Sequence, residues 1–293
     1  MMKTTLGAIC IACCLAAFVG CEIINPAEPL PAYLVIPSFD LVTDYSSEGS
    51  DAEKITEVWV FANDQLIGAY DLPAEVPILV DGVTDIEIYP GIKNNGVATD
   101  RIIYPFYSTY QLDLDMRPLE KDTIFPVFGY KESVTVINVD DFENNTVFTV
   151  DIGVEGEIVR TTDDAVVFEG DGSGLATLTA DEALTRIVTN EQDFDLPGNR
   201  LSYLEMNFRS NNSMAVGLLA VSPASTEREY LVILNPTTND AGEEEWNKVY
   251  VDLSTIAATY STFSDFEVFI ESVEDESGKE VELYFDNIKI VHF

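Results

Sequence analysis

Residues 55–72 read ITEVWVFANDQLIGAYDL, two apolar runs that are separated by Asn63 and Asp64. Both runs, residues 55–62 and 65–72, are rich in the β-branched and aromatic side chains that are typical of strands. A two-residue connection of Asn or Asp between such runs favours a tight turn between antiparallel strands. The stretch therefore predicts a β-hairpin, and it indicates an all-β fold for the region around it.

The neighbouring segments repeat this pattern. Residues 77–80 (PILV) and 83–89 (VTDIEIY) are separated by Asp81 and Gly82, which is a stronger hairpin signal. In the second of these runs isoleucines alternate with acidic residues, as in a strand with one buried and one solvated face. We therefore expect residues 33–138 to form an antiparallel β-sandwich. Its further strand-like segments are 102–114 and 133–139.

The rest of the chain, residues 139–293, reads as a second β domain. Strand-like runs such as LSYLEMNFRS, SMAVGLLAV and NKVYVDL alternate with turn-forming sequences such as GDGSG, LPGN and SNNS. Thr179 and Glu182 match a helix capping box ahead of an apolar run, but they fit the edge of a strand equally well. Many short strands with scarcely any helix indicate a sandwich or jelly roll. The predicted fold class is all-β, with two antiparallel β-sandwich domains, the second a jelly roll.

The N-terminus resembles the leader of a bacterial lipoprotein. Lys3 precedes a run of small and apolar residues that is too short to span a bilayer comfortably, which predicts a signal peptide over residues 1–20. Residues 18–21 read FVGC and resemble a lipobox, in which Cys21 is acylated with a diacylglyceryl group that holds fatty acids such as palmitate. An ordinary secretory leader that contains cysteines is the alternative. The resemblance implies an outer-membrane lipoprotein of the cell envelope, which either faces the periplasm or is exposed at the cell surface.

The cysteines support this interpretation. Cys10, Cys13 and Cys14 lie within the predicted leader, so the mature chain has Cys21 as its one cysteine. Disulfides, thiol catalysis and cysteine-based metal sites are thereby excluded. Residues 21–32 carry three prolines and no apolar periodicity, and they are predicted to form a stiff tether between the lipid and the fold.

The charge balance limits the classes of partner. The chain has 52 acidic and 15 basic residues, a formal net charge of −37. A field of this sign repels nucleic acid and anionic lipid headgroups, and it favours cations such as Ca²⁺. We therefore expect no nucleic-acid partner. Solubility of an exposed protein explains the same excess of acid without any bound cation.

Four segments of the second domain resemble the galactose-binding-like jelly rolls that serve as carbohydrate-binding modules. They are residues 141–144 (DFEN), 166–179 (VVFEGDGSGLATLT), 246–254 (WNKVYVDLS) and 284–293 (YFDNIKIVHF). The hairpin of the first domain resembles the immunoglobulin-like or PEGA-like sandwiches of Bacteroidota surface lipoproteins. The resemblance implies a lipid-anchored envelope protein whose jelly roll binds a ligand.

Members of the jelly-roll family often hold a structural Ca²⁺ between the first and last strands. The resemblance implies Glu143 and Asp286 as its ligands, with Asp141 and Glu169 as helpers. Ca²⁺ takes about six to eight oxygen ligands, so backbone carbonyl groups would have to complete the shell. The alternative is that Asp286 and Asn287 only bend the last strand.

A candidate glycan-binding face follows from alternation within LSYLEMNFRS. Leu204, Met206 and Phe208 fall on one face of this strand, which suits the core. The opposite face mixes an aromatic ring with polar groups, and it carries Tyr203, Glu205, Asn207 and Arg209. Aromatic rings stack on sugars while carboxylates and amides bind hydroxyl groups. A solvated sheet face explains the same pattern.

The two tryptophans favour different roles. Trp59 lies in phase with Ile55 and Phe61, which predicts that it belongs to the core. Trp246 follows three glutamates at the start of a strand, and it is either structural or a further sugar-stacking residue.

Catalysis is not expected. His292 is the one histidine and lies next to the C-terminus, so a Ser-His-Asp triad or a histidine metal site is hard to build. The chain also lacks the local motifs of jelly-roll glucanases, serine hydrolases and phosphate-binding loops. The predicted function is glycan binding through the C-terminal jelly roll by a non-enzyme. The alternatives are an assembly or adhesion component that binds other envelope proteins and, less favoured, a glycan-degrading enzyme.

Overall fold

The computed structural model describes residues 28–179, 182, 184–189, 194, 196–263, 265–274 and 278–293. These residues are almost entirely β-structure, with two short helices, α3 (Tyr45–Glu48) and α4 (Ser254–Thr259), and the all-β prediction is confirmed. None of the helices that the structure describes is long and apolar enough to cross a membrane. The predicted signal peptide, Cys21 and most of the predicted tether lie outside the described residues.

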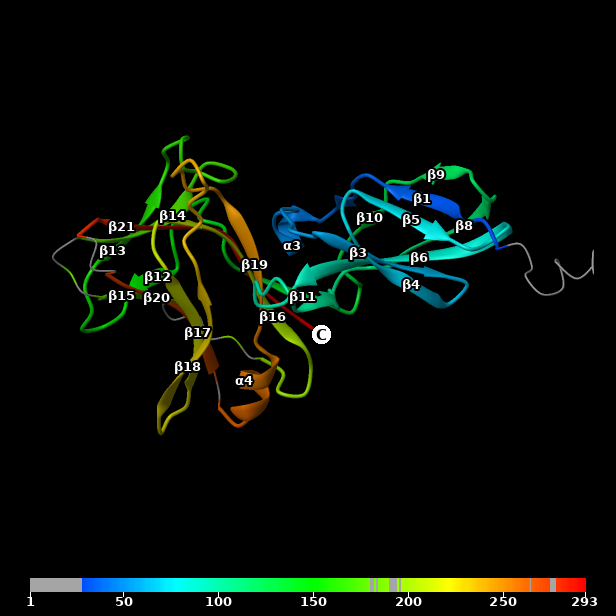
Figure 1. Cartoon of the computed structure of the whole chain (residues 1–293). Helices are drawn as coiled ribbons and strands as arrows, with labels where there is room; N and C mark the ends of the chain where they lie inside the picture. The colour runs from blue at the N-terminus through cyan, green and yellow to red at the C-terminus, as the bar shows by residue number, and fades with distance from the viewer. Residues whose placement is uncertain are drawn as a thin grey trace, which may run out of the picture.

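The first domain comprises β1 to β10 (Figure 1). One sheet has the order β4-β3-β6-β7, with β8 also paired to β6, and its core face packs against a smaller sheet of order β5-β1-β9, while β2 pairs with β10. The strands are β1 (Ala32–Ile36), β2 (Asp40–Leu41), β3 (Glu57–Ala62), β4 (Gln65–Asp71), β5 (Ala74–Ile78), β6 (Gly82–Lys93), β7 (Arg101–Ile103), β8 (Tyr110–Met116), β9 (Lys121–Thr123) and β10 (Val127–Phe128).

The second domain comprises β11 to β21 and is a sandwich of two sheets. One has the order β13-β14-β21-β16-β19, with β11 also paired to β21, and the other has the order β12-β15-β20-β17-β18. Leu204, Leu218 and Val268 from the two sheets meet in one core and are 0% exposed. The strands are β11 (Thr135–Asp140), β12 (Phe148–Val150), β13 (Glu157–Thr161), β14 (Ser173–Leu178), β15 (Leu184–Thr189), β16 (Ser202–Ser210), β17 (Met214–Val221), β18 (Thr226–Leu234), β19 (Asn247–Asp252), β20 (Asp265–Val273) and β21 (Val281–His292).

One of the two predicted hairpins is confirmed and the other is wrong. β3 and β4 pair across Asn63 and Asp64, whose φ angles of 49° and 62° are those that a type I′ turn requires. In contrast, β5 pairs with β1 whereas β6 pairs with β3 and β8. The chain at Asp81 and Gly82 therefore crosses from one sheet to the other. A turn signal identifies a change of direction, but it does not determine which strands then form hydrogen bonds.

One further strand differs from the sequence analysis, and another decides between two alternatives that the sequence left open. The strand expected at 133–139 in the first domain is β11, and it pairs with β21 in the sheet of the second domain. The apolar run after Glu182 is β15, a strand between β12 and β20 and not a helix. Its β-branched residues, such as Ile187 and Val188, favour a strand. Glu182 still accepts a hydrogen bond from the N–H of Thr179 at 2.7 Å.

The prediction that Trp59 belongs to the core is wrong, because the residues of β3 that face the core are its immediate neighbours. Val58 and Val60 are 0% exposed and face the core of the first domain, while Trp59 is half-buried on the other face of β3. On that face Phe61 packs edge-to-face against Tyr89, with ring centroids 5.3 Å apart. Because β3 is apolar on both faces, alternation within the strand does not identify the face that meets the core.

The two domains share one hydrophobic boundary. In Figure 1 the first domain lies on the right, with α3 beside β19 and β11 of the second domain. Tyr203, Tyr250 and Val291 belong to strands of the second domain, but their side chains pack into the core cluster of the first. They are 3%, 2% and 0% exposed. The domains therefore bury apolar surface against each other.

We expect Leu204→Ala to lower the free energy of unfolding by about 2–5 kcal/mol, because it leaves a cavity in the sandwich core. Ile233→Ala is the control: Ile233 is 72% exposed, so its truncation should change stability by no more than about 0.5 kcal/mol. Urea unfolding of the soluble 22–293 fragment measures both. Equal effects of the two substitutions would contradict this assignment of the core.

Candidate functional site

The predicted glycan-binding face of β16 is closed in the structure. Tyr203, Glu205 and Asn207 are only 3%, 0% and 3% exposed. The first domain covers this face, with the rings of Tyr104 and Phe106 centred 5.7 and 5.8 Å from the ring of Tyr203. The prediction that these residues line an open trough is therefore wrong. Alternation identifies the second face of a sheet but does not show whether another domain covers it.

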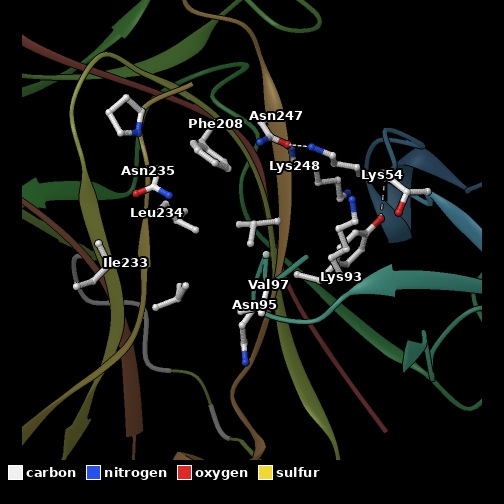
Figure 2. A pocket seen from close by; sticks show the side chains of 16 residues that line it. Lys54, Lys93, Asn95, Val97, Phe208, Ile233, Leu234, Asn235, Asn247 and Lys248 are labelled. Carbon is white, nitrogen blue, oxygen red and sulfur yellow. Dashed lines mark hydrogen bonds between the residues drawn. The ribbon is translucent and has the colours of Figure 1, made fainter. Parts of the chain in front are cut away.

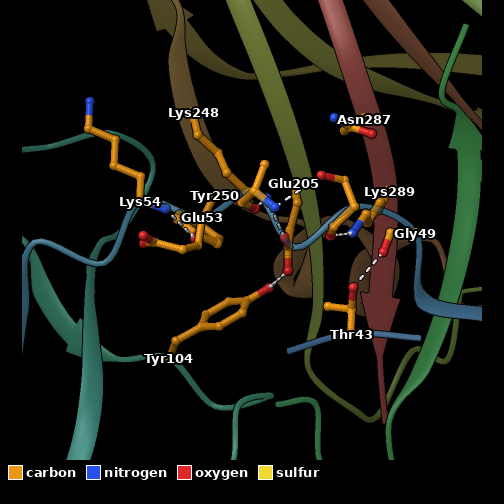
Figure 3. A network of polar contacts seen from close by, with 12 residues as sticks. Thr43, Gly49, Glu53, Lys54, Tyr104, Glu205, Lys248, Tyr250, Asn287 and Lys289 are labelled. Carbon is orange, nitrogen blue, oxygen red and sulfur yellow. Dashed lines mark hydrogen bonds and ion pairs between the residues drawn. The ribbon is translucent and has the colours of Figure 1, made fainter. Parts of the chain in front are cut away.

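A buried carboxylate, that of Glu205, organises the contact between the domains (Figure 3). Its Oε1 accepts hydrogen bonds from the hydroxyl groups of Tyr104 at 2.7 Å and Tyr130 at 2.9 Å. Its Oε2 forms an ion pair with Nζ of Lys248 at 2.9 Å. The strand register explains the grouping, because Glu205 lies opposite Lys289 of β21 and is flanked on its other side by β19, which carries Lys248.

Residues 50–54 of the first domain, here named the crossing segment, run over the same face. Nζ of Lys248 donates a hydrogen bond to the carbonyl oxygen of Ala52 at 2.6 Å, and Nζ of Lys289 donates one to the carbonyl oxygen of Ser50. An ammonium group has donors but no acceptor, so a buried lysine needs oxygens of this kind around it. The crossing segment supplies them.

The electrostatics of this network follow from burial and pairing. Burial by itself raises the pKa of Glu205, but the ammonium groups of Lys248 and Lys289 outweigh it and lower that pKa. Burial lowers the pKa of Lys289 to about 8, against the opposing effect of Glu205. Burial and then the charge of Glu205 raise the pKa of Tyr104 well above its ordinary value. At neutral pH the carboxylate is therefore ionised and the tyrosine is a neutral donor.

The sequence analysis did not single out Lys248 or Lys289. Lys248 precedes Val249 in the buried strand β19, and Lys289 lies between Ile288 and Ile290 in the buried strand β21. A charged residue in such a strand is the signal that could have identified them, because buried charges in proteins are normally paired.

The two remaining glycan-binding candidates, Arg209 and Trp246, lie at the other end of the covered face. The guanidinium of Arg209 stacks over the ring of Tyr284 at 5.3 Å, and it donates a hydrogen bond to the carbonyl oxygen of Ala165 at 3.4 Å. The ring of Trp246 lies 5.2 Å from that of Phe168 and 6.5 Å from that of Tyr284. The structure thus brings both candidates together, half-buried against protein groups.

Three of the carboxylates predicted to bind calcium, those of Asp141, Glu143 and Glu169, lie near Tyr45. Burial, followed by the charges of Asp141, Glu143 and Glu169, raises the pKa of Tyr45 to about 12. Within the described ranges, however, no three or more His, Cys, Asp and Glu side chains are arranged so that they could hold a metal ion. Both oxygens of Glu143 accept the N–H of Asp171, at 3.1 and 3.0 Å.

Asp286 is also engaged by protein donors. It accepts a hydrogen bond from the hydroxyl of Ser173 at 2.6 Å and one from the backbone N–H of Asn287 at 2.8 Å, and the side chain of Asn287 donates to Glu169 at 3.1 Å. Because Ca²⁺ needs several oxygens directed at one point, these residues do not fit the predicted calcium site. Asn287, with a φ of 48°, instead lies at an irregularity in β21, as the alternative interpretation expected.

An open site lies beside this closed face, at the boundary of the two domains (Figure 2). It is a cleft of about 410 Å³ between β18 and β19 of the second domain and the turn after β6 of the first. Its apolar lining includes Val97, Phe208, Val232, Leu234, Val249 and Tyr250. Its polar lining includes Lys54, Lys93, Asn95, Asn235, Asn247 and Lys248.

Two asparagines of the cleft have fixed orientations. The Oδ1 of Asn247 accepts hydrogen bonds from Nζ of Lys54 and from the backbone N–H of Lys248, the latter at 2.8 Å. The Oδ1 of Asn95 accepts the backbone N–H of Asp252 at 2.8 Å. Because both oxygens are engaged, the two side chains present their NH₂ groups as donors, and no described protein acceptor bonds to either group.

Sequence reasoning did not identify this cleft. Its residues come from two domains and are far apart in the chain, so no local motif groups them. The scarcity of basic residues is the one available signal, because 15 lysines and arginines among 293 residues make each of them informative.

We expect Glu205→Gln to lower the free energy of unfolding by about 3–5 kcal/mol, because two buried ammonium groups lose their carboxylate. Adding Lys248→Met to this variant should cost less than the sum of the two single effects. The control is Lys121→Met, which breaks the Lys121–Glu75 pair at 2.7 Å, whose side chains are 56% and 49% exposed. It should cost at most about 1 kcal/mol. Similar losses for Glu205→Gln and Lys121→Met in urea unfolding would contradict the role of the network.

Stability should also depend on pH through Asp286. Burial raises the pKa of Asp286 from 3.8 to about 7, so between these values the folded protein binds a proton that the unfolded chain releases. The protonated carboxyl group of Asp286 thus stabilises the folded state fully below pH 3.8, and this stabilisation is lost as the pH rises through about 7. Asp286→Asn removes the group. The difference in unfolding free energy, wild type minus variant, should fall between pH 4 and 8, and a constant difference would refute the shift.

Comparisons with known proteins find solved structures of low similarity to the chain. No protein-family model and no curated protein matches the chain. The chain is similar to a solved structure of carbohydrate-binding modules from the β-sandwich superfamily, with 14% identity over 90% of this chain and 98% of that chain and a TM-score of 0.40.

The chain is also similar to two modules of Clostridium thermocellum cellulosomal cellulases. The family 11 module of Lic26A-Cel5E has 12% identity over 54% of this chain and 95% of that chain, with a TM-score of 0.38. The family 30 module of Cel9D-Cel44B has 13% identity over 53% of this chain and 96% of that chain, with a TM-score of 0.38. At these values the similarities assign no ligand or activity to the chain.

Proposed function

We propose that this chain is a non-catalytic, lipid-anchored protein of the bacterial cell envelope that binds a glycan in the cleft between its two domains. The lipid anchor rests on the sequence, since a short apolar leader ends at FVGC and the next residues form a proline-rich segment. Location in the outer membrane is part of the same proposal.

The cleft is the observation that carries the proposal. Its volume of about 410 Å³ lies within the range of about 300–1,000 Å³ that is typical of small-ligand sites. An apolar floor that includes Phe208 and Val249 suits the CH groups of a sugar ring, and a rim of amide and ammonium groups suits its oxygens. The contact around Glu205 holds the two sides of the cleft in fixed positions.

This proposal moves the binding site away from the face of β16. There the space that a polysaccharide would need is occupied by the crossing segment and by the aromatic side chains of Tyr104 and Phe106. The cleft at the edge of the sandwich remains open to solvent, since Val97 and Ile233 of its lining are 48% and 72% exposed.

A second candidate function is assembly with other envelope proteins. The observation that favours it is β18, which forms one edge of its sheet and exposes Tyr230 and Ile233 at 51% and 72%. An exposed edge strand with apolar side chains can pair with a strand of another protein. Binding to a partner protein together with no binding to glycans would favour this function.

A glycan-array screen of the soluble 22–293 fragment tests the proposal. Val97→Trp fills the cleft without a change in charge, and it should weaken binding of the glycan hits at least tenfold. Val83→Trp is the matched control, because Val83 is 73% exposed at the opposite end of β6 from the cleft. Unchanged binding by Val97→Trp would place the site elsewhere, and a screen without hits would exclude glycan binding.

A further inference from the structure

We propose that the cleft selects an acidic glycan, in which a carboxylate or sulfate group of the sugar lies between Lys54, Lys93 and the amide of Asn247. This inference rests on the proposed glycan binding and specifies its ligand class. Three features of the lining support it: the sign of its charges, the absence of an ion-pair partner for Lys93 among the described residues, and the excess of hydrogen-bond donors.

The charged residues of the cleft lining are opposite in sign to the net charge of the chain. Acidic residues outnumber basic ones by 52 to 15 in the whole sequence. Among the described residues, the cleft lining nevertheless contains Lys54, Lys93 and Lys248 and no aspartate or glutamate. Lys248 is committed to Glu205 and the crossing segment, so Lys54 and Lys93 are the cations available to a ligand.

Among the residues that the structure describes, no carboxylate forms an ion pair with Lys54. The pKa of Lys54 is lowered by burial and by the positive charge of Lys93. No carboxylate forms an ion pair with Lys93 in the described part of the chain. Burial raises the pKa of Glu57 against the opposing charges of Arg101 and Lys93, and the carboxylate of Glu57 is paired with Arg101 at 2.9 Å. An anion between the two ammonium groups would relieve their repulsion.

The hydrogen-bonding groups of the cleft are mainly donors. The side-chain oxygens of Asn95 and Asn247 are engaged within the protein, so their NH₂ groups remain for a ligand. Together with the ammonium groups of Lys54 and Lys93, these NH₂ groups are hydrogen-bond donors. They therefore suit a ligand group that has only acceptors. Carboxylates and sulfates are such groups, whereas a sugar hydroxyl also donates a hydrogen bond. The preferred ligand is therefore anionic.

The test compares glycans that differ only in their charged group. Polygalacturonate is compared with its methyl ester, and chondroitin sulfate with its desulfated form, both by isothermal calorimetry on the 22–293 fragment. The acidic member of at least one pair should bind at least tenfold more tightly than its partner of lower charge. The pair that shows the difference distinguishes a carboxylate from a sulfate as the recognised group.

Charge substitutions in the cleft provide the second arm. Lys93→Met and Lys54→Met should each weaken binding of the acidic glycan about tenfold or more, and Lys93→Glu should weaken it further. Lys121→Met is the control, because it removes the same charge at an exposed pair on β9 outside the cleft lining. Thermal melting of each variant verifies that it is folded.

The possible failures are distinguishable. If glycans bind and Val97→Trp abolishes binding, but the charged and less charged partners bind equally, the proposed function stands and this inference is wrong. The inference is also wrong if acidic glycans are preferred but the lysine variants bind them like the wild type. If no glycan binds, the proposed function itself fails.

Discussion

The contact around Glu205 is the constraint on which the arrangement of the two domains depends. One carboxylate and the ammonium groups of Lys248 and Lys289 are removed from water on a single sheet face, which is costly unless each finds partners. The second domain supplies only the ion pair. The tyrosine hydroxyl groups and the carbonyl oxygens that complete the network belong to the first domain. The buried charges therefore have their hydrogen-bond partners only when the two domains are in contact. In the second domain alone, some of these partners would be missing.

This contact also determines which surfaces near the domain boundary stay open to solvent. It closes the face of β16 that a free sandwich would expose, and it brings the turn after β6 to the open edge between β18 and β19. The cleft there combines apolar side chains of one domain with lysines of the other. Because the charge of the chain is −37, a cleft without a carboxylate in its lining differs in chemistry from the protein as a whole. That difference is the basis of the proposed preference for an acidic ligand.

Much of the fold could be predicted from local patterns. The turn at Asn63 and Asp64 joins two paired strands as expected, and the alternation in LSYLEMNFRS correctly placed Leu204 in the core. Local patterns failed where both faces of a strand are apolar, as at Trp59, and where a turn connects strands of different sheets, as at Gly82. Of the candidate site, the sequence indicated the polar face of β16 but not its cover, and it gave no indication of the cleft.

The sequence by itself determined the all-β class, the alternation that places Leu204 in the core, and the acidity of the chain, because these depend on side chains that are neighbours along the chain. The tertiary structure decided which domain receives β11, that Tyr203 and Glu205 are buried, and that Lys54 and Lys93 meet Asn247 in one cleft. These features depend on contacts between residues far apart in the chain, such as Tyr130 with Glu205 and Lys54 with Asn247. Such contacts form only in the folded chain, and no local pattern records them.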